Sequence, residues 1–205
     1  MNANNFCIGT GFEKACPNLY SAMTKQLFLY LGMLLLFTSC KKDESNGTYS
    51  TNTAIIQKIN DLYSQYGKSN EAIYNQPIPD DVFSPELKKT LETAIHASTA
   101  DIEKVKNSSH PDEKPLIFEG ATFSSLYEGY TSYTIKSIII HDKTAEALIQ
   151  LEYNMTSPKI LWTDTVSLID SGEGWKIDNI TFDKKFSHSK DLRTSLKDFI
   201  QYSKQ

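Results

Sequence analysis

The feature that most constrains the fold of this 205-residue chain is a change in the spacing of its apolar residues. Within residues 55–66 and 87–105, apolar side chains recur every three or four positions, which is the period of a helix with one buried face. From Tyr133 onward, apolar and β-branched residues form short segments, and residues 145–153 alternate between apolar and polar with little interruption. Alternation of this kind indicates a strand with one buried face. Helices followed by consecutive strands predict an α+β fold.

Two helical segments are expected before the strands. The first is expected to begin with Thr53 as its N-cap. Its apolar face carries Ile55, Ile59, Leu62 and Tyr66. The second is expected to begin after Ser84, which precedes a proline in the first helical position. The stretch Ala97-Ser98-Thr99 weakens its middle, so the sequence leaves open whether this segment is one helix or two.

Four strands are expected, at residues 133–140, 145–153, 160–169 and 175–182. The connections between them are short, which favours an antiparallel meander. In the last strand the apolar residues change sides, and this predicts a bulge near Asp178-Asn179. A final helix with Leu196 on its buried face is expected after a cap at Ser187 or Ser189. We expect the sheet to curve around the helices, with residues 54–202 folding as a single domain.

The segment before the predicted domain has the features of an export signal. A positively charged start is followed by an apolar run at 27–37, which is too short to span a bilayer as a helix. The run ends in Thr38-Ser39-Cys40. Residues 23–39 are therefore predicted to be a signal peptide. Because this signal is complete without them, residues 1–22 are predicted to be a misassigned start.

Small residues before a cysteine resemble the lipobox of bacterial lipoproteins. The resemblance implies that the thiol of Cys40 is joined to diacylglycerol, that the preceding peptide is cleaved, and that the new amine is acylated by a fatty acid such as palmitate. Residues 40–53, the lipidated cysteine and the polar residues after it, are predicted to be a flexible tether. Lys41 in place of aspartate favours the outer membrane, and Lys41-Lys42-Asp43-Glu44 resembles the surface-export signals of Bacteroidetes lipoproteins. We therefore expect an outer-membrane lipoprotein of the cell envelope that faces the periplasm or the surface.

The predicted domain also resembles a known family. The matching segments are FSSLYEG (123–129), WTDTVSL (162–168), GWKIDNITF (174–182) and LRTSL (192–196). They are similar to uncharacterised Bacteroidetes lipoproteins with a cystatin-like domain of the nuclear-transport-factor-2-like superfamily. The resemblance implies two to three N-terminal helices, a four-stranded meander curved around them into a cone, and a C-terminal helix. The superfamily contains enzymes, binding modules and assembly domains, so the resemblance implies no particular activity.

Asp164 is the candidate for acid–base chemistry. It shares one side of its strand with Trp162 and Leu168, so burial of that side would place a carboxylate among apolar side chains. Burial raises the pKa of a carboxyl group and suits it to general acid or base catalysis. The alternative is a structural aspartate that is hydrogen-bonded to a tyrosine or a backbone amide. Leu161 and Ile169 lie on the other side, and the sequence leaves open which side is buried.

Aromatic residues are frequent in the predicted strands. Tyr133, Tyr153, Trp162 and Trp175 would line the concave side of a curved sheet, where they would hold a small apolar or sugar-like ligand. The alternative is an ordinary aromatic core beneath the helices.

Composition and motif content exclude several classes of function. With a net charge of −4, the chain lacks the basic surface typical of nucleic-acid binding. Its four histidines are not spaced as metal ligands, and no nucleophile or phosphate-binding motif occurs, so we expect no metal and no cofactor. The favoured interpretation is a non-catalytic module that binds a small ligand or an envelope protein. The alternative is a small lyase or isomerase in which Asp164 is the base and Tyr133 or Tyr153 orients the substrate.

Overall fold

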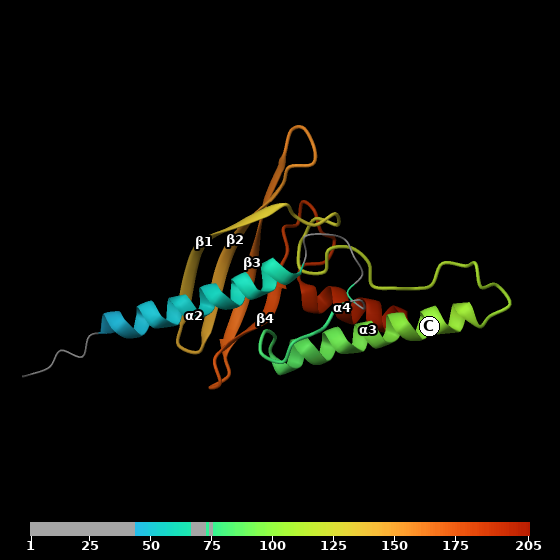
Figure 1. Cartoon of the computed structure of the whole chain (residues 1–205), viewed down its shortest axis with the longest axis horizontal. Coiled ribbons are helices and arrows are strands. Elements are labelled where there is room, and N and C mark those ends of the chain that lie inside the picture. The colour runs from blue at the N-terminus through green and yellow to red at the C-terminus, as the bar shows by residue number, and fades with distance from the viewer. Residues whose placement is uncertain (1–43, 67–72, 74–75) are drawn as a thin grey trace, which may run out of the picture. The chain divides into compact units, whose positions relative to one another are not determined.

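A computed structural model of the chain describes residues 44–66, 73 and 76–205. The helices of this part are α2 (Glu44–Gln65), α3 (Pro85–Lys106) and α4 (Leu192–Tyr202), as labelled in Figure 1. The strands are β1 (Ser132–His141), β2 (Thr144–Tyr153), β3 (Ile160–Asp170) and β4 (Trp175–Thr181). Residues 45–205 form one compact unit. The predicted α+β class with an antiparallel sheet is confirmed, whereas the predicted signal peptide and Cys40 lie outside the described residues.

The sheet is an antiparallel meander with the strand order β1-β2-β3-β4. The predicted bulge in the last strand is confirmed by the pairing of β4 with β3. Ser167 pairs with Asn179 and Leu168 pairs with Ile177, so that Asp178 is an extra residue on β4. This extra residue allows Ile177 and Ile180 to point to the same side of the sheet, and both are fully buried.

The two edges of the sheet differ. On the free side of β4, Phe83 forms a parallel bridge with Ile177, and Asp191 forms an antiparallel bridge with Thr181. Segments from before α3 and before α4 therefore bridge to that edge at Ile177 and at Thr181. At the other end of the strand order, β1 contains a bulge that the sequence analysis did not predict, with Lys136 as the extra residue.

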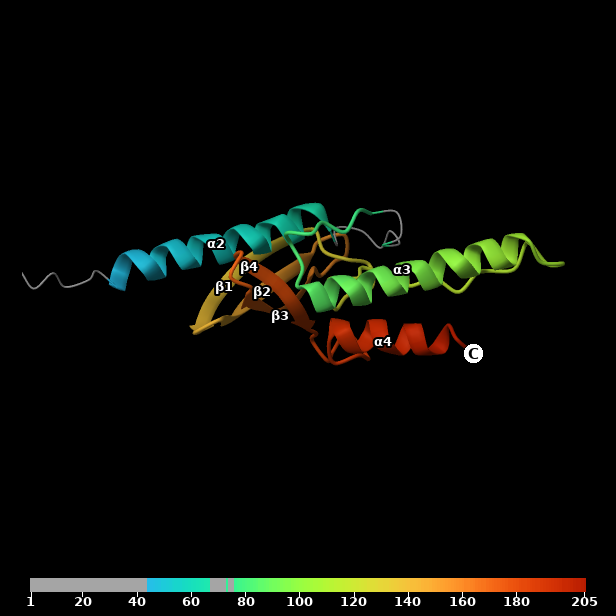
Figure 2. The ribbon, with the colours of Figure 1, turned by 90° about the horizontal axis from the view of Figure 1, so that it is seen from below.

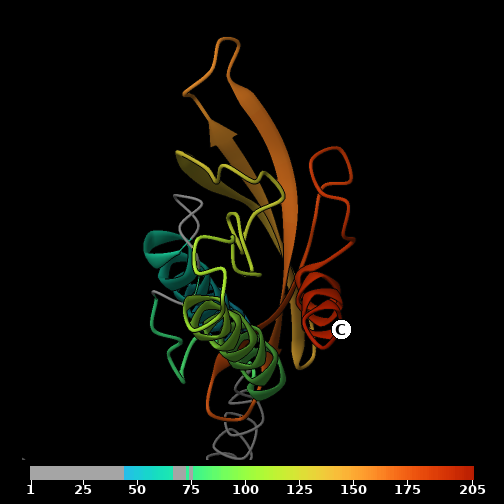
Figure 3. The same ribbon diagram turned by 90° about the vertical axis from the view of Figure 1, so that its right-hand side faces the viewer.

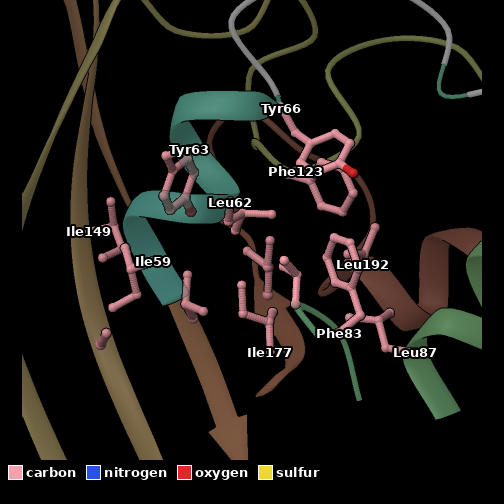
Figure 4. Close-up of a cluster of buried hydrophobic side chains, with 14 of the residues drawn as sticks. Ile59, Leu62, Tyr63, Tyr66, Phe83, Leu87, Phe123, Ile149, Ile177 and Leu192 are labelled. Carbon is pink, nitrogen blue, oxygen red and sulfur yellow. The ribbon is translucent and has the colours of Figure 1, made fainter. Parts of the chain in front are cut away.

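One face of the sheet is buried under α2, which runs across it in Figures 1 and 2. The buried positions of β2 and β3 are Ala145, Ala147, Ile149, Leu151, Trp162, Asp164, Val166 and Leu168. Figure 4 shows Ile59 and Tyr63 of α2 directed toward Ile149 of the sheet. On the opposite face, Leu161 remains 46% exposed. The side of β3 that carries Asp164 is therefore the inner one.

The first helix begins earlier than the sequence predicts. We expected Thr53 to cap it, but α2 begins at Glu44, within the segment 40–53 assigned to the tether. No proline interrupts residues 44–53, so weak helix formers such as Gly47 lower the propensity without ending the helix. The predicted buried face is confirmed, with Ile55, Ile59, Leu62 and Tyr66 all at most 1% exposed.

The second helix is a single, unbroken element. Ser84 is its N-cap, as predicted, and its side chain accepts a hydrogen bond from the backbone N–H of Leu87 at 3.2 Å. Ser98 does not interrupt α3, because its hydroxyl donates to the carbonyl of Ala94 one turn earlier at 3.0 Å. The same hydroxyl accepts from the backbone N–H of Phe118 at 3.0 Å and so holds the loop that follows α3.

The last helix begins later than expected. The N-cap of α4 is Asp191, whose Oδ1 accepts from the backbone N–H of Thr194 at 2.8 Å, so the predicted caps Ser187 and Ser189 are wrong. Asp191 takes this position because its bridge to Thr181 already fixes extended backbone there. Leu192 and Leu196 are fully buried. Figure 3, which looks along α3 and α4, shows the two helices next to each other.

Candidate functional site

Asp164 lies on β3 at the point where β4 leaves the sheet. The final pair between the two strands joins Thr165 to Thr181, so β3 extends past β4 from Asp164 toward its own N-terminus. Asp164 has 0% of its surface exposed, although it carries a carboxyl group. A buried carboxylate is unfavourable unless hydrogen-bond donors surround it.

Both carboxylate oxygens of Asp164 are occupied by donors from other segments. The backbone N–H of Ser125 donates to Oδ2 at 2.9 Å, and the Ser125 hydroxyl donates to Oδ1. The backbone N–H of Asp183 donates to Oδ1 at 3.1 Å, and Trp162 Nε1 donates to Oδ2 at 3.4 Å. Asp164 thus joins the loop before β1 and the loop after β4 to the inner face of the sheet.

The environment of Asp164 shifts its proton affinity in two directions. Burial raises the pKa of Asp164, while the hydrogen bonds from Ser125, Asp183 and Trp162 lower it. Burial has the larger effect, so the pKa of Asp164 lies above its ordinary value of 3.8. The raised pKa is the property expected of an acid–base residue, but the four donors are the property expected of a structural acceptor.

A pocket of about 430 Å³ lies beside Asp164, between the loop that precedes β1 and the segment that links β4 to α4. Its lining residues are Phe118, Glu119, Gly120, Ala121, Thr122, Ser124, Ser125, Tyr127, Phe182, Phe186, Ser187, His188, Ser189 and Ser195. Ser125 separates the carboxylate from the pocket, because Ser125 lines the pocket and Asp164 does not. Figure 1 shows the two wall-forming segments close together above α4.

The pocket wall contains two hydroxyl groups without a hydrogen-bond partner among the described residues. They belong to Thr122 and Ser124, which are 8% and 6% exposed. The neighbouring Ser125 hydroxyl differs, because it donates to Asp164 and accepts from the backbone N–H of Asp183 at 2.7 Å. Sequence analysis missed Thr122 and Ser124, and the run Thr122-Phe123-Ser124-Ser125 was the signal that could have drawn attention to them.

The aromatic residues that were predicted to bind a ligand lie at different places. Tyr133 and Trp162 occupy the same row of the sheet, since both pair with Leu151. The Tyr133 hydroxyl donates to Asn60 Oδ1 on α2 at 2.9 Å, and Trp162 is 3% exposed. Tyr133 therefore packs against α2, whereas Trp162 packs against Phe186 in the segment that follows β4.

The other two aromatic candidates lie toward opposite ends of β3. Tyr153 pairs with Ile160 at its first residue, and Trp175 pairs with Asp170 at its last. Trp175 lines a separate pocket of about 500 Å³ together with residues from the middle of α2 and from the loop before α3. The structure thus does not bring the four aromatic residues together.

Gly120 allows the wall of the 430 Å³ pocket to be tightly packed. Its backbone has φ +86°, and a Cβ at this position would meet Cδ2 of Tyr127 at 2.7 Å. We expect Gly120→Ala to lower the free energy of unfolding by about 2–3 kcal/mol, because it combines left-handed strain with a clash against the ring. Urea denaturation measures this change.

Gly172 provides the matched control for that substitution. Its φ is +83°, but a Cβ added at this residue would have no heavy atom within 4 Å. Gly172→Ala should therefore carry only the backbone strain and cost about 1 kcal/mol. Equal losses at the two glycines would show that the contact with Tyr127 contributes nothing.

Neither a metal cluster nor a membrane-spanning helix is found in the described part of the chain. Within residues 44–66, 73 and 76–205, no three His, Cys, Asp or Glu side chains are grouped as metal ligands would be. No helix in these same ranges has an apolar stretch of the length that a membrane span requires. Comparison of the chain with protein-family models, with curated proteins and with solved structures found no match. Inferences about function therefore rest on the residues and geometry of this chain.

Proposed function

We propose that this protein is a lipid-anchored, non-catalytic binding domain of the cell envelope, of the Bacteroidetes lipoprotein type. Cys40 carries the lipid and attaches the chain to the outer membrane, and the domain that follows faces the periplasm or the surface. The apolar run at 27–37, the residues Thr38-Ser39-Cys40 and the polar sequence after them support the anchor.

We also propose that the domain has the cystatin-like form of the nuclear-transport-factor-2-like superfamily. Support comes from the meander order of the sheet and from α2, which crosses its inner face (Figure 2). This form provides a binding surface without fixing a reaction.

The observation that carries the binding role is the 430 Å³ pocket beside Asp164. Its volume lies within the range of about 300–1,000 Å³ that is usual for small-molecule sites. The nearest buried carboxylate, Asp164, holds the pocket walls together through Ser125 and Asp183 and does not line the pocket itself. A small ligand is therefore the partner that this geometry favours over an envelope protein.

A lyase or isomerase remains the second candidate, and the raised pKa of Asp164 is the observation that favours it. In such an enzyme a substrate proton would have to reach a carboxylate that Ser125 separates from the pocket. The hydroxyl of Tyr133, one of the two tyrosines expected to orient the substrate, donates to Asn60. These contacts support the binding role more strongly than the catalytic one.

The anchor is tested by replacing the cysteine. We expect Cys40→Ala to abolish incorporation of labelled palmitate, because the thiol is the atom to which diacylglycerol is attached. The chain should then accumulate as unprocessed precursor or as a soluble product, which fractionation of a lipoprotein-producing bacterial host would show.

Ser45→Ala is the matched control, because it makes a similarly small change five residues after the cysteine. This variant should incorporate palmitate as well as the unchanged chain does. Equal labelling of the Cys40→Ala variant would contradict the proposed anchor.

A further inference from the structure

We infer that the pocket between residues 118–127 and 182–195 binds a neutral sugar of one or two rings. This inference rests on the proposed binding function and adds the chemical class of the ligand. It is drawn from three properties of the pocket wall, which are its charge, its hydroxyl groups and its aromatic rings.

The charge of the wall argues against an anionic ligand. Besides Tyr127, the ionisable residues that line the pocket are Glu119 and His188. Neither a lysine nor an arginine lines it. Lys114, the nearest cation to Glu119, is paired with its carboxylate at 2.6 Å. A phosphate or a fatty-acid carboxylate would therefore meet a negative side chain without a free basic partner, which is the reverse of the usual recognition of anions.

The hydroxyl groups argue against a purely hydrocarbon ligand. The hydroxyl oxygens of Thr122 and Ser124 lack hydrogen-bond partners among the described residues and are already shielded from water, and an apolar ligand would supply neither of them with a partner. Rotation about χ1 gives each side chain a choice of directions for its hydroxyl. A ligand that carries several hydroxyl groups both donates and accepts, so it satisfies either orientation.

The aromatic rings argue for a ligand that also has apolar faces. Phe118, Phe182 and Phe186 are among the lining residues, and Tyr127, which also lines the pocket, is 53% exposed. Gly120 lets this ring lie close to the backbone, because only a residue without a Cβ permits the approach. A sugar ring has C–H faces that pack on aromatic side chains and hydroxyl groups at its rim, so it complements both parts of this wall.

The inference is tested with a panel of methyl glycosides, inorganic phosphate and octanoate, each mixed with the full-length chain in detergent. Saturation-transfer NMR detects weak binding at millimolar concentrations. We expect at least one glycoside to receive saturation and neither phosphate nor octanoate to compete with it. If no glycoside binds, or if octanoate or phosphate displaces the bound glycoside, the assigned ligand class is wrong.

Two variants locate the bound sugar. Thr122→Val and Ser124→Ala remove the unpartnered hydroxyls while keeping the shape of the wall, and each should weaken glycoside binding about tenfold. Neither should lower the melting temperature, because neither hydroxyl has a partner within the described residues to lose. Thr93→Val, on the exposed surface of α3, is the control and should leave binding unchanged.

The outcomes separate this inference from the proposed function. Loss of glycoside binding in the Thr122→Val and Ser124→Ala variants but not in the Thr93→Val variant supports the sugar site. Glycoside binding that all three variants retain places the site elsewhere and overturns the inference, although the chain would still be a binding protein. If the chain binds no member of the panel, both the sugar site and the binding role proposed for this pocket are wrong. The palmitate result for Cys40 would be unaffected.

Discussion

The substitution Leu196→Asp should largely unfold the domain. Leu196 is 0% exposed on α4, and it belongs to the same core as Leu192 and Leu91. An aspartate there would be a buried charge without a partner, which costs about 4 kcal/mol or more. Small domains have a total stability of about 5–15 kcal/mol, so the variant should be mostly unfolded at low urea concentration. Circular dichroism during urea titration measures the loss.

Lys197→Asp is the control for this substitution. Lys197 is the next residue on α4 and is exposed, so an aspartate there should change stability by no more than about 0.5 kcal/mol. If the Leu196→Asp variant retains a cooperative transition at the midpoint of the unchanged chain, α4 is an appendage and not a part of the core.

The second large effect is expected from Asp164→Ala. The substitution leaves the backbone N–H and the hydroxyl of Ser125, and Nε1 of Trp162, without their buried acceptor, whereas the backbone N–H of Asp183 keeps the Ser125 hydroxyl as an acceptor. Each unsatisfied donor costs about 1–3 kcal/mol, and removal of the buried carboxylate returns part of that cost. We therefore expect a net loss of about 3 kcal/mol in the free energy of unfolding. Asp198→Ala, at an exposed position on α4, should change stability by less than about 0.5 kcal/mol.

The pH dependence of this loss has a definite sign. The folded pKa of Asp164 is above the unfolded value of 3.8, so between these two values the folded state binds more protons than the unfolded state. The contribution of Asp164 to stability is therefore complete below pH 3.8 and decreases as the pH rises through the folded pKa. The difference between the unchanged chain and the Asp164→Ala variant should be larger in acid than at neutral pH. If the difference in stability between the two chains instead grows with pH, the carboxylate is stabilised in its ionised form. If the Asp164→Ala variant has unchanged stability, a catalytic role for Asp164 is favoured over a structural one.

The strands of the sheet could be predicted from the sequence because the pattern that indicates each strand lies within a few neighbouring residues. The alternation of apolar and polar residues in β2 follows directly from the two-residue period of a strand. In β4 the apolar residues change from one side of the strand to the other, and this change indicated the bulge at Asp178. The cap at Ser84 was equally local, since serine and proline stand next to each other. The cap of α4 was missed because the bridge between Thr181 and Asp191 depends on tertiary structure.

The candidate site could be predicted only in part. The alternation of sides along β3 made Asp164 a candidate for the buried face. The groups that donate hydrogen bonds to it come from Ser125, 39 positions earlier, and from Asp183, 19 positions later. Both lie in loops, where no period relates sequence to position. The pocket that these loops form was therefore not predicted, and the four aromatic candidates were chosen instead because they lie in strands, where a pattern could be recognised.

The unequal edges of the sheet affect how copies of this domain behave when they are crowded together. An uncovered strand edge is a template for pairing with another chain, and a run of apolar residues makes such pairing more favourable. The edge of β4 is occupied by Phe83 and Asp191, whereas β1 carries the run Ile138-Ile139-Ile140. In β1 this run follows the bulge at Lys136, and a bulge and a lysine are both devices that hinder edge-to-edge aggregation. The domain thus combines one edge that is bridged at two residues with one edge that is interrupted by a bulge, and both features hinder assembly into extended sheets.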